Sequence, residues 1–90
     1  MKKRQLHKTM KELRAELKKT KPADENVRAH IQSLLHEIDA LIDEPGEISS
    51  HRYQQFLERL RESARHFEAS HLSLTVAVGR VVEALSNMGI

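Results

Sequence analysis

Residues 70–90, SHLSLTVAVGRVVEALSNMGI, are the most apolar part of the sequence. Taken as a helix, they place apolar residues at alternating steps of four and three, which makes one continuous seam. The members of this seam are Leu74, Val78, Val81, Leu85 and Met88. The same seven-residue frame extends back through residues 53–67, with His71 as the only polar interruption. The pattern predicts an all-α protein with coiled-coil-like seams.

The length and composition indicate one small domain over residues 1–90. The chain is 39% hydrophobic and has one Tyr, two Phe and no Trp, so Leu, Ile and Val must supply most of the core. Chains with so thin a core often complete it by oligomerisation. The absence of cysteine excludes disulfides and suits the reducing cytoplasm. We also expect no membrane span and no secretory signal, because no long apolar run follows the basic start MKKRQLHK.

Four helical segments are predicted: a basic helix over about 2–20, a second over about 22–43, a third over about 50–69 and a fourth over about 71–88. The first carries a narrow stripe of Leu6, Met10, Leu13 and Leu17, which is typical of a coiled-coil seam. Pro45 and Gly46 lie in a turn over residues 44–49, where the chain reverses. The expected architecture is an antiparallel helical hairpin or bundle of three to four helices.

The helix ends have recognisable signals. Asp24 or Thr20 is a candidate cap for the second helix, and Ser49 or Ser50 for the third. Gly89 is expected to end the last helix in a left-handed conformation, with Ile90 folding back. The third and fourth segments form either one long rod or two helices, and we favour a break near residues 70–72.

Charge is distributed unevenly along the chain. Residues 1–21 contain nine Lys or Arg against two Glu, a net charge of +7. Residues 22–90 contain six basic and eleven acidic groups, a net charge of −5. A basic arm on an acidic body is compatible with binding to nucleic acid or to anionic lipid, and equally with docking on the acidic part of its own or a neighbouring chain.

The basic helix therefore has a functional and a structural interpretation. As a nucleic-acid contact it would use its cations on phosphates, namely Lys2, Lys3, Arg4, Lys8, Lys11, Arg14, Lys18 and Lys19. No aromatic residue is interleaved and no known nucleic-acid motif follows, so a solvated face with ion pairs is favoured. A membrane-surface helix is disfavoured by the narrow apolar stripe.

No residue pattern indicates catalysis, a metal or a cofactor. The six histidines include no two at the spacing of three or four that helical metal ligands need. His71 is interpreted as a capping or edge residue, with a protonation switch as the alternative. On the third helix, Glu58 with Arg61 and Glu62 with Arg65 are predicted surface pairs.

Gly79 is unexpected inside a helix, where glycine costs about 1 kcal/mol relative to alanine. Close approach of another helix, with Ala77 and Ala84 nearby, is the favoured explanation. The alternative is that Gly79 opens a groove from which Arg80 reaches a partner carboxylate or phosphate.

The C-terminal stretch resembles a family of short proteobacterial helical proteins, a domain-of-unknown-function family. The resemblance is carried by residues 64–71 (ARHFEASH), Leu74-Thr75, residues 77–82 (AVGRVV) and residues 84–90 (ALSNMGI). Relatives often have proline where this chain has Leu72, which implies a helix start near His71. The resemblance implies a helical fold but no activity.

Together these patterns predict a non-enzymatic interaction or scaffold protein. We expect a homodimer or small homo-oligomer that associates through the seam from Leu74 to Met88. The alternative is a nucleic-acid-associated protein that uses the basic first helix.

Overall fold

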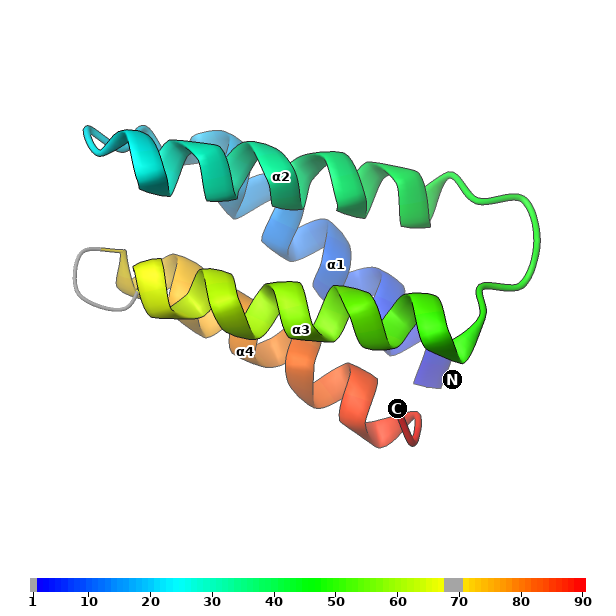
Figure 1. Ribbon diagram of the computed structural model, residues 1–90. Helices are drawn as coiled ribbons and strands as arrows, with labels where there is room; N and C mark the ends of the chain where they lie inside the picture. Colours follow the sequence, from blue (N-terminus) through cyan, green and yellow to red (C-terminus); the bar gives the residue numbers. More distant parts are fainter. Residues whose placement is uncertain (1, 68–70) are drawn as a thin grey trace.

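Four helices form an antiparallel bundle in the computed structural model (Figure 1). They are α1 (Lys2–Lys19), α2 (Glu25–Ile42), α3 (Ser50–Phe67) and α4 (Leu72–Asn87). The structure describes residues 2–67 and 71–90, with Lys2 described only as part of its helix. Each helix packs on the next, and α1 also packs on α4, which closes a bundle of 36 × 22 × 20 Å. The predicted all-α bundle is confirmed.

The core consists of the seams that the apolar periodicity predicts. In α1 the whole narrow stripe is buried, with Leu6 and Leu13 at 0% exposure and Met10 and Leu17 at 1%. On α2 the buried residues also recur at steps of four and three, while Leu35 and Ile42 are half-buried beside them. The largest buried side chains, Phe56 and Phe67, come from α3. Because every helix presents one apolar stripe inward, the polar residues are left on the outside.

Two predicted helix caps are present. Asp24 accepts hydrogen bonds from the backbone N–H groups of Asn26 at 2.7 Å and Val27 at 3.4 Å, which satisfies two free donors at the start of α2. Thr20 instead donates its hydroxyl to the carbonyl of Glu16 at 2.7 Å. At the start of α3, Ser49 accepts from the N–H of Arg52 at 3.2 Å.

The third and fourth predicted segments form two helices, α3 and α4, instead of one long rod. The third helix ends at Phe67 and α4 begins at Leu72, after His71 in a non-helical conformation with φ −136° and ψ 73°. The His71 side chain makes no capping bond there. Ser70, one end of the expected break, lies outside the described residues. The shared seven-residue frame therefore supplies two helices that pack on each other.

The end of α4 has the predicted form. Gly89 has φ 81°, a left-handed conformation that glycine adopts without steric cost. The N–H of Ile90 donates to the carbonyl of Leu85 at 3.4 Å, and the Ile90 side chain packs against the core. The chain therefore folds back on the last turn of α4.

Candidate interaction surfaces

The seam predicted for self-association lies inside the chain's own bundle. Exposure is 0% for Leu74, Val81 and Leu85 and 1% for Val78, while Met88 is half-buried against the core. Since α4 packs on both α1 and α3, these helices supply the partners that we expected a second copy to supply. A second copy that meets the closed bundle would therefore contact the other side of α4.

The opposite side of α4 carries the exposed large apolar side chains of the described residues. Leu72 is 71% exposed and Val76 is 54% exposed. Gly79 and Glu83 follow on the same face, so the steps from Leu72 are four, three and four. We define Leu72, Val76, Gly79, Arg80 and Glu83 as the outer face of α4.

The structure corrects the favoured explanation for Gly79. A Cβ atom added at this residue would meet nothing within 4 Å, and the residue is exposed. Because Ala77 and Ala84 are buried on the inner side, they do not mark a close contact at Gly79. None of the four described helices uses the space that the missing side chain leaves.

Two charged residues flank Gly79 without an ion pair. Arg80 and Glu83 are exposed, and neither lies within 4.0 Å of an opposite charge among the described residues. Beside Arg80 a shallow groove separates α4 from α1. Its lining combines small and acidic side chains: Thr9, Glu12, Ala15, Glu16, Ser73, Val76, Ala77 and Arg80.

Most of the predicted anion-contact residues on α1 are exposed, and few are paired. Arg14 is half-buried and lies 3.2 Å from Asp39 of α2, and Lys19 lies 3.2 Å from Glu16. The side chain of Lys2 is outside the described part. The remaining cations are exposed and make no ion pair among the described residues; we call Lys3, Arg4, Lys8, Lys11 and Lys18 the basic face of α1. The ion pairs that we expected on this helix thus involve only Arg14 and Lys19 among its described cations.

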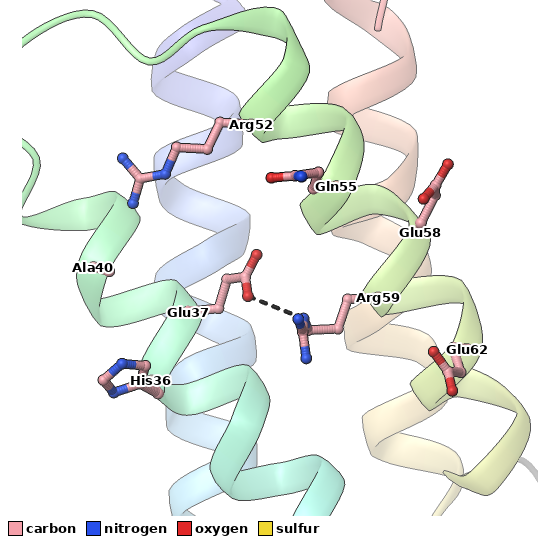
Figure 2. A pocket seen from close by; sticks show the side chains of 8 residues that line it. All are labelled: His36, Glu37, Ala40, Arg52, Gln55, Glu58, Arg59 and Glu62. Atoms are coloured by element: carbon pink, nitrogen blue, oxygen red, sulfur yellow. Dashed lines mark ion pairs between the residues drawn. The ribbon is translucent and has the colours of Figure 1, made fainter.

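The groove between α2 and α3 is polar and internally paired (Figure 2). Arg59 lies 3.0 Å from a carboxylate oxygen of Glu37 and donates to Ser33 at 2.8 Å. Arg52 lies 3.1 Å from Glu44, which belongs to the loop between α2 and α3. The predicted pairs within α3, Glu58 with Arg61 and Glu62 with Arg65, are not formed within 4.0 Å. These ion pairs join α2 and the loop after it to α3, while Glu58 and Glu62, one turn apart on α3, line the groove without an ion pair among the described residues.

A histidine pair joins α2 to α3. The rings of His30 and His66 stack with centroids 4.0 Å apart and an angle of 26° between their planes. The hydroxyl of Ser63, a fully buried residue, lies 3.2 Å from Nδ1 of His30, and the imidazole tautomer sets the direction of this hydrogen bond. Burial lowers the pKa of His30, and His66 lowers it further, against the opposing effect of Glu62. Arg59 also lowers this pKa.

Sequence patterns could not reveal the histidine pair, because its members lie far apart in the chain and belong to different helices. Leu72 and Val76 lie outside the spacing of the α4 seam in the sequence, and the structure shows that both are exposed. Among residues 2–67 and 71–90, no group of three or more His, Asp or Glu residues is arranged to hold a metal ion. None of the described helices is long and apolar enough to cross a membrane.

These features define a small four-helix bundle domain with two uncovered surfaces, one on α4 and one on α1. Residues 6–90 match the model of the domain-of-unknown-function family DUF4404, and the chain belongs to that family. The match confirms the resemblance to a family of unknown function and extends it over nearly the whole chain. Searches of curated proteins and of solved structures found no match.

Proposed function

We propose that this protein is a non-enzymatic helical interaction protein that self-associates through the outer face of α4. The observation that carries the proposal is the exposure of Leu72 and Val76 one turn apart, with the open Gly79 one turn further on. An exposed apolar pair beside a residue without a side chain allows a second helix to approach closely. The absence of cysteine supports a cytoplasmic location for this role.

A second copy of the chain is the occupant that the charges favour. The outer face carries one cation and one anion, Arg80 and Glu83, and neither is paired among the residues that the structure describes. In a two-fold contact of antiparallel helices centred between Gly79 and Glu83, the Arg80 of each copy lies near the Glu83 of the other. An isologous interface of this kind is self-complementary, so one surface satisfies both charges.

The expected association is weak. Full burial of Leu72 and Val76 from both copies would contribute at most about 6–12 kcal/mol. Association itself costs about 4–15 kcal/mol, so only a small surplus remains. The most favourable of these values leave about 8 kcal/mol, so a dissociation constant of about 1 μM is the tightest that the contact can reach, and we expect a dimer that forms between micromolar and millimolar concentration.

Sedimentation velocity over a series of protein concentrations tests the proposal. The double variant Leu72→Lys/Val76→Lys should remain monomeric, since the new ammonium groups stay hydrated and repel their counterparts. Ala40→Lys, which changes an exposed residue on α2, is the control and should dimerise as the parent chain does. Circular dichroism confirms that each variant is folded. A parent chain that stays monomeric up to about 1 mM would refute the proposal.

Charge exchange tests the identity of the partner. The single variants Arg80→Glu and Glu83→Arg each place like charges together in the two-fold contact and should weaken it. The combined exchange should restore the dimer, because the two charges again face opposite partners. If the single variants dimerise unchanged, the contact is not centred between Gly79 and Glu83. Association with nucleic acid, the alternative function, would use α1 and is compatible with this contact.

A further inference from the structure

The basic face of α1 has no role in the fold or in the proposed contact on α4. We infer that it binds the phosphate backbone of double-stranded nucleic acid without reading its sequence. The inference begins from the five exposed cations, Lys3, Arg4, Lys8, Lys11 and Lys18, which lack acidic partners among the described residues. Unpaired cations on one rigid helix form an electrostatic surface whose counterions a polyanion can release.

These cations lie together on the helix. At 3.6 residues per turn, their positions fall within an arc of about 140°. The acidic residues of α1 lie elsewhere, since Glu12 and Glu16 line the groove toward α4. From Lys3 to Lys18 the helix rises about 22 Å, a length over which duplex DNA presents on the order of a dozen phosphates. A stripe of positive charge thus matches a row of regularly spaced negative charges.

A membrane surface fits the same face poorly. Interfacial helices bind lipid by inserting an apolar stripe between the headgroups. The apolar stripe of α1 is already buried in the core, with 0–1% exposure from Leu6 to Leu17. Inserting it in a bilayer would require the bundle to open, so only the charges of this face are available.

Single strands are also a poor match, since proteins that bind them usually stack bases on aromatic side chains. The first helix has no aromatic residue. The three aromatic residues of the chain, Tyr53, Phe56 and Phe67, are buried with exposures of 4%, 0% and 0%. The surface therefore offers charge without a stacking platform, which favours the regular backbone of a duplex.

Fluorescence anisotropy with a labelled mixed-sequence DNA duplex, and with an RNA duplex of the same sequence, tests the inference. If all five cations contact phosphates, the logarithm of the affinity falls against the logarithm of the salt concentration with a slope of about −4.5. The affinity should then weaken about 500-fold between about 50 and 200 mM salt. Scrambling the base sequence of the duplex should leave the affinity unchanged.

Matched variants distinguish binding through the basic face of α1 from a general effect of the protein's positive charge. Lys8→Gln/Lys11→Gln removes two contacts, so the slope should fall to about −2.7 and the weakening over the same salt range to about 40-fold. Arg61→Gln/Arg65→Gln removes the same charge from exposed residues of α3 and should leave the slope unchanged. Equal losses in both variants would overturn the inference, as would the absence of duplex binding at about 50 mM salt. Binding to anionic lipid vesicles or to single strands in preference to a duplex would overturn it too. Because the α4 variants leave this face intact, failure of self-association leaves the duplex result interpretable.

Discussion

Replacing Gly79 by alanine should stabilise the monomeric bundle. The residue lies in the interior of α4, is exposed, and has open space where the new methyl group would stand. Its backbone is not left-handed, since Gly89 is the glycine with positive φ. The full difference in helix propensity should therefore be recovered, about 0.8–1 kcal/mol. For a chain of this size that corresponds to a rise in Tm of about 4–8 °C per kcal/mol.

Thermal and urea unfolding followed by circular dichroism measure this effect, at low protein concentration where the monomer prevails. Gly89→Ala provides the contrast, because φ 81° should cost an alanine about 1 kcal/mol. In the proposed dimer the methyl groups added by Gly79→Ala would stand between two helices, so this substitution should weaken self-association while it stabilises the monomer. A loss of monomer stability in Gly79→Ala would refute the reasoning, since it would require a close neighbour that the structure does not contain.

Three further perturbations test the interior of the bundle. Asp24→Ala should lower the free energy of unfolding, measured by urea titration, by about 1 kcal/mol, because two backbone donors lose their acceptor. Asp24→Asn should retain most of the stabilisation by this cap. Phe56→Ala should cost about 3–5 kcal/mol, since the ring is fully buried; a loss below about 1 kcal/mol would contradict its central position. The pKa of His30 is lowered from 6.5 in the fold, so the neutral imidazole contributes stability that is present above pH 6.5 and is lost as the pH falls through the folded pKa. As the pH falls through this range, the urea concentration at the midpoint of unfolding should decrease in the parent chain and decrease less steeply in His30→Asn. If the two midpoints depend on pH in the same way, the histidine pair is not the cause of the pH dependence.

Local sequence patterns were sufficient for the helices and their ends. Asp24, two residues after Pro22, and Gly89, directly after Met88, act through contacts a few positions away, so their roles are readable from the chain alone. The pairing of Arg59 with Glu37 depends on how α3 is positioned against α2, which no local pattern specifies.

The interaction surfaces were only partly predictable for a related reason. An apolar seam such as that of α4 can be covered by another part of the chain or by a second copy, and both offer similar side chains. In the bundle, α1 and α3 cover the seam of α4, so only the residues outside this seam are available to a partner. Leu72 and Val76 stand outside the seam spacing, but the sequence does not specify whether another helix covers them; in the bundle they are exposed.

The contact between α1 and α4 also has a consequence during synthesis. It joins the first helix of the bundle to the last, whereas every other helix packs on a neighbour in the sequence (Figure 1). A nascent chain on the ribosome can pair α1 with α2 and then α2 with α3, but one flank of α1 stays bare until α4 has been translated. The apolar stripe from Leu6 to Leu17 is thus the earliest part of the core to be made and the last to be fully enclosed, and during that interval it is a surface that chaperones can recognise.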